Sequence, residues 1–262
     1  MLAQSFAVGF TMKKDAVTAC VLIIGNEILS GRTQDVNLNH IATTLGAWGI
    51  QVREARVVPD VTGEIVAAVN ACRARYDYVF TTGGIGPTHD DITADCIAAA
   101  FGVDLVVHPE IAERIERRPA PPDVMASRMR MARVPEGATL IDNLTGGPQG
   151  FRIENVFVMA GIPAVMQAML ASLEGKLETG AVVHSRSVTA FVGESQIAGP
   201  LRDIQERYPN LDLGSYPFFR RDRYGTSLVL RGTDEAALDA MLEEVKAAIV
   251  DAGETPQDIR RS

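Results

Sequence analysis

The stretch of this sequence that could do chemistry is "TTGGIGPTHDDITAD", residues 81–95. Three glycines, Gly83, Gly84 and Gly86, precede the adjacent acids Asp90 and Asp91. Glycines let a backbone approach a ligand closely and present N–H groups to an anion. The helix predicted to follow adds the positive end of its dipole, which favours phosphate. One aspartate is enough to cap that helix, which leaves the other free for Mg²⁺, a cation usually bound by one or two carboxylates plus phosphate oxygens.

A plainer interpretation of the same stretch stays open, namely a sharp strand-to-helix turn with solvated acids. The stretch is not a Walker loop, because no Gly-Lys-Ser/Thr follows the glycines. It is not a dinucleotide-binding fingerprint either, since His89 occupies the place of the last glycine. The pattern therefore indicates phosphate and metal chemistry without matching either of these two motifs.

Three other unusual turns also follow predicted strands, at residues 25–27, 59–60 and 160–163. In an open parallel sheet the ligand crevice lies outside the carboxyl ends of the strands, so we expect these turns to converge with the glycine-rich stretch. Glu27 is then a second metal ligand or a water-orienting base, or else only a solvated acid or a cap. Asp60 either caps the helix after it, or serves the ligand, or does both.

Hydrophobic patterning predicts the elements that must position these turns. Short apolar runs at 19–24, 50–58 and 77–81 read as buried strands, and each is followed by a helical pattern. This alternation predicts an α/β fold with three layers, in which a mostly parallel sheet has helices on both faces. Residues 135–150 read as loop-rich, 151–161 as a hairpin arm or strand, and 163–173 as a helix. We expect an N-terminal tail at 1–17, this domain at 18–175, and a small α+β domain at 180–262.

Composition excludes several classes of protein. The 262 residues carry a formal net charge of −8, which argues against broad binding to nucleic acid or anionic membranes. The three cysteines show no CxxC spacing, so a disulfide scaffold or a cysteine–zinc site is not expected and a reducing cytoplasm fits best. No apolar run approaches the roughly 20 residues that span a bilayer. The expected partner is a small molecule.

Several motifs in order carry a family resemblance. Besides residues 81–95, these are "IGNEILSGRTQDVN" (24–37), "VVPD" (57–60), "PQGF" (148–151), "MAGIPAVMQAML" (159–170) and "GSYPFF" (214–219). Together they resemble the competence/damage-inducible protein A family, whose N-terminal part is a molybdopterin-binding domain. The likeness extends over nearly the whole chain, and it is specific for the family more than for any one reaction.

The resemblance implies a site drawn from these motifs. Its catalytic acids would be Asp60 and Asp91, which match the functional acids of related molybdopterin adenylyltransferases. A metal would be held by Asp91, Asp90 and Glu27. The ligand-binding residues would be Asn26, Glu27, Thr82, Gly83, Gly84, Gly86, Thr93 and Gly161.

The resemblance also implies a reaction, a pyrophosphatase activity on ADP-ribose-like or FAD-like dinucleotides that depends on Mg²⁺ or another divalent metal such as Co²⁺ or Mn²⁺. The alternatives are a non-catalytic module that binds a phosphorylated nucleotide or pterin, and adenylyl transfer to molybdopterin. Asn26 stands where many relatives carry Asp or Thr, and Ile162 replaces a small polar residue of the adenylyltransferases, which disfavours pterin adenylylation. The sequence stops at Ser262 without the amidase domain of full-length bacterial relatives, so we expect no deamidation of nicotinamide mononucleotide. Assembly into homo-oligomers, as dimers or trimers, is implied as well.

Overall fold

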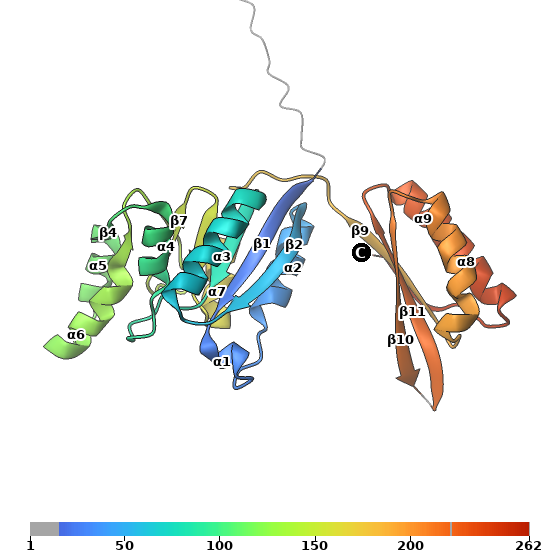
Figure 1. The fold of residues 1–262 in the computed structure, drawn as a ribbon, viewed down its shortest axis with the longest axis horizontal. Coiled ribbons are helices and arrows are strands. Elements are labelled where there is room, and N and C mark those ends of the chain that lie inside the picture. Colours follow the sequence, from blue (N-terminus) through green and yellow to red (C-terminus); the bar gives the residue numbers. More distant parts are fainter. Residues whose placement is uncertain (1–15, 221, 262) are drawn as a thin grey trace, which may run out of the picture. The chain divides into compact units, whose positions relative to one another are not determined.

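The computed structural model describes residues 16–220 and 222–261. It divides into two compact units, with the boundary between Ala181 and Val182 (Figure 1). Most of the tail expected at 1–17 lies outside the described residues. No helix in the described part of the chain is long and apolar enough to cross a bilayer.

The first unit is built on a six-stranded sheet in the order β2-β1-β3-β8-β7-β6. The strands are β1 (Val17–Ile24), β2 (Ile50–Val58), β3 (Tyr78–Thr82), β6 (Thr139–Ile141), β7 (Gly150–Ile153) and β8 (Val156–Met159). Strands β2, β1, β3 and β8 are parallel, whereas β7 and β6 are antiparallel additions at one edge. The mostly parallel α/β sheet predicted from the sequence is therefore confirmed.

Helices cover both faces of this sheet, and β1 shows why. Its side chains alternate between two cores, with Cys20 and Leu22 in one and Val21 and Ile23 in the other. The helices around the sheet are α1 (Asn26–Leu29), α2 (Asn37–Ala47), α3 (Thr62–Arg75), α4 (Thr93–Phe101) and α7 (Pro163–Ala171). Apolar residues of α3 and α4 join the first core, and those of α2 and α7 join the second. A central strand buried on both faces needs the continuous apolar run that its sequence has.

The stretch between α4 and β7 is more regular than its sequence suggests. A two-stranded antiparallel sheet of β4 (Leu105–Val107) and β5 (Arg133–Pro135) accompanies the helices α5 (Pro109–Glu116) and α6 (Pro122–Met129) and the 3₁₀ helix η1 (Arg130–Ala132). Within the loop-rich segment expected at 135–150, residues 139–141 form β6, which pairs with β7. The segment read as one arm or strand at 151–161 is the hairpin β7–β8. Strands of three residues are too short to show the alternation of apolar and polar residues from which a strand is predicted.

The second unit is a small α+β domain. Its antiparallel sheet has the order β10-β11-β9-β12, and its core is filled from the helices α8 (Glu194–Arg207) and α9 (Glu235–Asp251). The strands are β9 (His184–Ala190), β10 (Asp212–Arg220), β11 (Arg223–Gly232) and β12 (Gln257–Arg261). The strand β12 was not predicted, because its polar sequence "QDIRR" gives no apolar signal.

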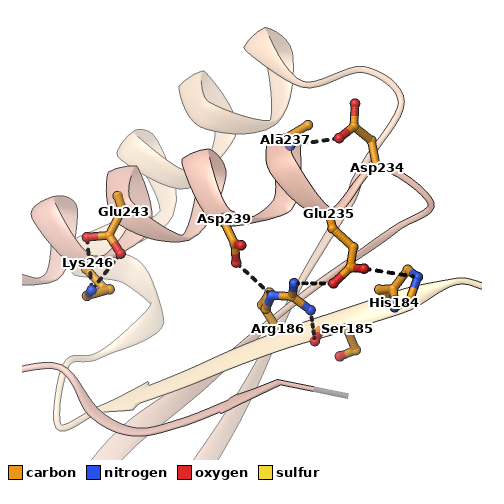
Figure 2. Close-up of polar contacts among 9 residues, drawn as sticks. All are labelled: His184, Ser185, Arg186, Asp234, Glu235, Ala237, Asp239, Glu243 and Lys246. Atoms are coloured by element: carbon orange, nitrogen blue, oxygen red, sulfur yellow. Dashed lines mark hydrogen bonds and ion pairs between the residues drawn. The ribbon is translucent and has the colours of Figure 1, made fainter.

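A buried arginine joins β9 to α9 in this unit (Figure 2). Arg186 is only 3% exposed, and its guanidinium donates to Asp239 at 2.8 Å and to Glu235 at 2.9 Å. A third hydrogen bond reaches the carbonyl of Ser185, and His184 lies 3.7 Å from Glu235. Because a buried charge is costly unless it is paired and hydrogen-bonded, we interpret this network as structural.

We predict that Glu235→Gln weakens the contact of α9 with β9 at neutral pH and has less effect in acid. The hydrogen bond from Arg186, assisted by the charge of His184, holds the pKa of Glu235 below its ordinary value of 4.5. Such a carboxylate stabilises the folded state above its unfolded pKa, and this contribution is lost as the pH falls through the folded pKa. Hydrogen exchange of α9 in the intact chain should therefore be faster in the variant at neutral pH, and should converge with wild type as the pH falls below 4.5.

Glu243→Gln is the matched control, because it removes the partner of Lys246 on the same helix, and Lys246 is 28% exposed where Arg186 is 4% exposed (Figure 2). Exposed ion pairs contribute only about 0–1 kcal/mol. If Glu235→Gln exchanged no faster than this control at neutral pH, the network would not stabilise the unit.

Candidate functional site

The turns after β1, β2, β3 and β8 meet at one edge of the first unit's sheet. Gly25 N–H donates to the carbonyl of Val58 at 3.1 Å, and Asn26 N–H donates to Asp60 Oδ2 at 2.8 Å. On the other side, Gly83 N–H donates to the carbonyl of Met159 at 3.2 Å. Hydrogen bonds thus join the carboxyl end of β1 to that of β2, and the carboxyl end of β3 to that of β8.

Gly83 is the point where these turns approach most closely. Its φ is +102°, and a Cβ there would lie 2.2 Å from the carbonyl oxygen of Ile24 at the end of β1. A Cβ on Gly161 would lie 3.3 Å from Gly83 Cα, and the carbonyl of Gly161 accepts a 2.8 Å hydrogen bond from Asn37. Only glycine fits at position 83, because both the conformation and the space exclude a side chain.

The segment Gly84–Gly86, which we call the glycine loop, has three consecutive N–H groups that donate to no atom of the described residues. All three residues are partly buried. The N–H of Gly83, expected to face a ligand, is instead used by Met159. Partly buried backbone N–H groups normally donate to protein, water or ligand. The N–H groups of Gly84, Ile85 and Gly86 have no acceptor in the described protein, so they are available to water or a ligand.

Two threonines expected to bind ligand are buried at this edge of the sheet. Thr82 is 1% exposed and Thr93 is fully buried. The hydroxyl of Thr93 donates to the carbonyl of Gly83 at 3.0 Å, and its N–H donates to the carbonyl of Gly84 at 3.0 Å. In the structure Thr93 therefore braces the loop rather than facing its outer side.

Neither Asp90 nor Asp91 caps α4, contrary to the expectation that one of them would. The cap position is Ile92, and no side chain hydrogen-bonds to the first turn of the helix. Asp91 Oδ2 instead accepts a 2.8 Å hydrogen bond from the N–H of Thr88, which closes the turn at residues 88–91 that follows the glycine loop. Asp90 is largely exposed and lies 3.9 Å from His89, which is 97% exposed. Asp91 is the acid close to the glycine loop, since a Cβ on Gly86 would lie 2.6 Å from its Oδ2.

Asp60 and Glu27 belong to the same edge. Of the roles left open for Asp60, capping of the following helix is wrong, because α3 is preceded by Val61 and has no side-chain cap. Asp60 instead fixes the start of α1 through the N–H of Asn26. Glu27 folds back over the turn, so that a Cβ on Gly25 would lie 2.5 Å from its carboxylate oxygens.

The predicted site residues line two hollows rather than one. The first, which we call the Asn37 hollow, is lined by Glu27, Asn37, Thr82, Gly83 and Gly161. The second, the Gln149 hollow, is lined by Gly84, Gly86, Asp91, Arg130, Arg133 and Gln149. Ile85 packs against both cores of the unit. Among the described residues no group of three or more His, Cys, Asp or Glu is placed to hold a metal, so Glu27, Asp90 and Asp91 do not form a metal site on their own.

Sequence reasoning missed four residues of these hollows, namely Asn37, Arg130, Arg133 and Gln149. Asn37 and Gln149 are 5% and 4% exposed, and each has a side-chain oxygen without a hydrogen-bond partner in the described chain. Asn37 closes the motif 24–37, and Gln149 lies within "PQGF", so a signal was present for both. The arginines follow α6, whose methionines indicate only packing.

We predict that Gly84→Ala destabilises the first unit more than Gly102→Ala. Both glycines have a φ of +67°, where any other residue costs about 1–2 kcal/mol. A Cβ at position 84 would meet Thr93 Oγ1 at 2.2 Å, whereas at position 102 nothing lies within 4 Å. Overpacking of this kind adds about 1–3 kcal/mol, which urea unfolding of the two variants should resolve. Equal losses would mean that Thr93 moves aside freely and does not brace the loop.

Comparison with known proteins agrees with this architecture. Residues 20–178 match the family model described as a probable molybdopterin binding domain. Residues 182–257 match the family model of the FAD synthase middle domain. The two matches follow each other along the chain as the two units do.

Individual relatives are similar to this chain over most of its length. Protein TK1472 of Thermococcus kodakarensis is 34% identical over 242 residues, which is 87% of this chain and 95% of that protein. A CinA-like protein of Gemmatimonas aurantiaca is 32% identical over 75% of this chain, which spans about half the length of that relative (50%). The crystal structure of CinA from Thermoplasma acidophilum is 33% identical, covers 62% of this chain and 98% of its own, and superposes with a TM-score of 0.58. The chain therefore belongs to the family of the probable molybdopterin binding domain, among its CinA-like members.

Proposed function

We propose that this chain binds the diphosphate of a phosphorylated nucleotide at the glycine loop and hydrolyses it with a divalent metal. The substrate class is an ADP-ribose-like or FAD-like dinucleotide, with a phosphorylated pterin as the alternative ligand. The oxygen of a water molecule attacks one phosphorus, the bond from that phosphorus to the bridging oxygen breaks, and two monophosphates result. The protons of the water pass to the products or to solvent.

The observation that carries the proposal is the row of free amides at Gly84, Ile85 and Gly86. Three adjacent donors suit the oxygens of a phosphate. The first turn of α4 is close to them, since Thr93 N–H donates to the carbonyl of Gly84, so the helix dipole adds to the attraction. The loop is held in this conformation by Thr93 and by the hydrogen bond from Gly83 to Met159. Donors fixed before the ligand arrives need no reorganisation during the reaction, which is the main way in which enzymes assist phosphoryl chemistry.

The donor set around Asp91 fits a divalent cation that is held largely by substrate. Asp91 Oδ2 is engaged by Thr88, whereas Oδ1 has no hydrogen bond or ion pair in the described chain. Mg²⁺ commonly takes one or two carboxylates together with phosphate oxygens and water. Asp91 would therefore hold the metal beside the loop, and the metal when bound would polarise the phosphoryl group.

The other acids have supporting roles in this proposal. Asp60 is a positioning residue, since it anchors Asn26 and with it the short helix that carries Glu27. Glu27 lines the Asn37 hollow next to Gly83. From there it is the carboxylate best placed to orient a water molecule or a ligand N–H group.

The two family matches support a phosphorylated ligand of either class, nucleotide or pterin. The second unit matches the middle domain of FAD synthase, a protein named for a product that contains a diphosphate. The first unit matches a molybdopterin-binding domain, and molybdopterin also carries a phosphate. Assembly of the chain into a dimer or trimer stays a prediction.

Turnover on a panel of dinucleotides tests the proposal. Incubation with ADP-ribose, FAD and NADH in the presence of Mg²⁺, Mn²⁺ or Co²⁺ should release mononucleotides. We predict that Asp91→Asn lowers kcat by about 100-fold or more, as losses of a group that stabilises transition-state charge do. Binding should persist, because asparagine can still accept the N–H of Thr88 and the loop amides are untouched.

Asp104→Asn is the matched control, an exposed aspartate beyond the opposite end of α4. Unchanged turnover in Asp91→Asn would remove this residue from the mechanism. Calorimetric binding without release of any product would favour the non-catalytic module. Transfer of an adenylyl group from ATP to molybdopterin would favour the adenylyltransferase.

A further inference from the structure

The carboxamide of Gln149 is buried and held in one orientation. Its Nε2 donates to Glu110 Oε1 at 2.7 Å, and Glu110 also pairs with Arg114 at 3.1 Å. The hydrogen bond from Gln149, followed by the charge of Arg114, lowers the pKa of Glu110, so this carboxylate is ionised at neutral pH. An ionised carboxylate only accepts hydrogen bonds. The nitrogen of Gln149 must therefore face Glu110, and its oxygen is left on the other side.

That oxygen has no partner. Gln149 is 4% exposed and lines the Gln149 hollow, and its Oε1 is buried without a hydrogen bond in the described chain. A buried acceptor of this kind costs about 1–3 kcal/mol when it is left unsatisfied. It calls for a donor, which means a hydroxyl or an N–H group.

Two arginines bring unpaired donors to the same hollow. Arg130 Nη2 donates to the carbonyl of Asp91 at 3.4 Å, and Arg133 Nη2 pairs with Asp95 at 3.0 Å. The Nε atoms of both arginines are buried, and neither has a partner in the described chain. Guanidinium N–H groups suit phosphate oxygens, which they bind with charge-assisted hydrogen bonds. The free amides of Gly84 and Gly86 line the same space.

We propose that Arg130, Arg133 and Gln149 form a ribosyl-phosphate subsite beside the glycine loop. The guanidinium groups would bind the phosphate, and Gln149 Oε1 would accept a hydrogen bond from a sugar hydroxyl. This inference rests on the proposed function, because it assigns one half of the diphosphate ligand to the Gln149 hollow. It makes the hollow selective for a phosphate that carries a sugar over inorganic diphosphate.

Occupation of this subsite requires the arginine side chains to move. The cavity volume of the hollow is about 20 Å³, which holds one water molecule at most. The Arg133 side chain is 31% exposed, so its guanidinium can shift toward solvent and bind the phosphate at the mouth of the hollow. The buried amide of Gln149 stays in place because Glu110 anchors it.

Calorimetric titration of the intact chain without divalent metal, so that ADP-ribose is not hydrolysed, tests the subsite with ADP-ribose, AMP, ribose 5-phosphate and inorganic diphosphate. Gln149→Leu should weaken ADP-ribose binding about tenfold, the equivalent of one lost hydrogen bond, and should leave inorganic diphosphate unchanged. Arg130→Met should weaken both ligands about tenfold or more, because it removes a charged donor. AMP and ribose 5-phosphate then report which half of ADP-ribose loses affinity in Gln149→Leu.

Arg117→Met is the matched control, since it removes a guanidinium that pairs with Glu113 on α5 and does not line the hollow. Equal ADP-ribose affinity in wild type, Gln149→Leu and Arg130→Met would overturn the subsite. If Gln149→Leu does not fold, Arg130→Met decides the phosphate contact, and the preference of wild type for ribose 5-phosphate over inorganic diphosphate decides the sugar contact. Binding that follows the expected pattern without any turnover would reject the hydrolase and keep the subsite, whereas a wild type that binds none of the probes would reject both.

Discussion

The close approach of two strand ends governs the site. β1 and β3 are neighbours in a parallel sheet, and the chain after β3 passes so near the carbonyl of Ile24 that a Cβ on Gly83 would lie 2.2 Å from it. This approach brings the N–H of Gly83 to Met159 at the end of β8, which fixes three neighbouring strand ends relative to one another. Everything that follows along the chain, from the glycine loop to α4, starts from this position.

The free amides are a consequence of that constraint. Once Gly83 is committed to β8, the next residues leave the sheet, and Thr93 takes both carbonyls of the turn, those of Gly83 and Gly84. The carbonyls are thereby satisfied, and the N–H groups of Gly84, Ile85 and Gly86 are left without partners in the described chain. The carbonyl groups of Gly83 and Gly84 are hydrogen-bonded and the N–H groups of the loop are not, so the loop favours an anion over a cation.

Much of this arrangement could be predicted from the sequence, because the relevant signals are local. The apolar run of β1 and the glycines after β3 report burial and close approach directly. Partners of side chains could not be predicted. Asp60 and Asp91 have the sequence positions of helix caps, yet they bind Asn26 and Thr88, because the chain turns before each helix begins. The role of Gln149 depends on Glu110, 39 positions away, and no local pattern connects the two.

The two buried carboxamides add a second layer to this argument. Asn37 is anchored through its nitrogen to Gly161 and Gln149 through its nitrogen to Glu110, and each has a side-chain oxygen with no partner in the described chain. One lines the hollow beside Gly83, the other the hollow beside Gly84 and Gly86. The edge therefore offers backbone donors in the middle and side-chain acceptors on either side. Inorganic phosphate leaves both of these side-chain acceptors without a donor. A phosphate with hydroxyl or N–H groups on both flanks complements all of it, and a nucleotide diphosphate has that distribution.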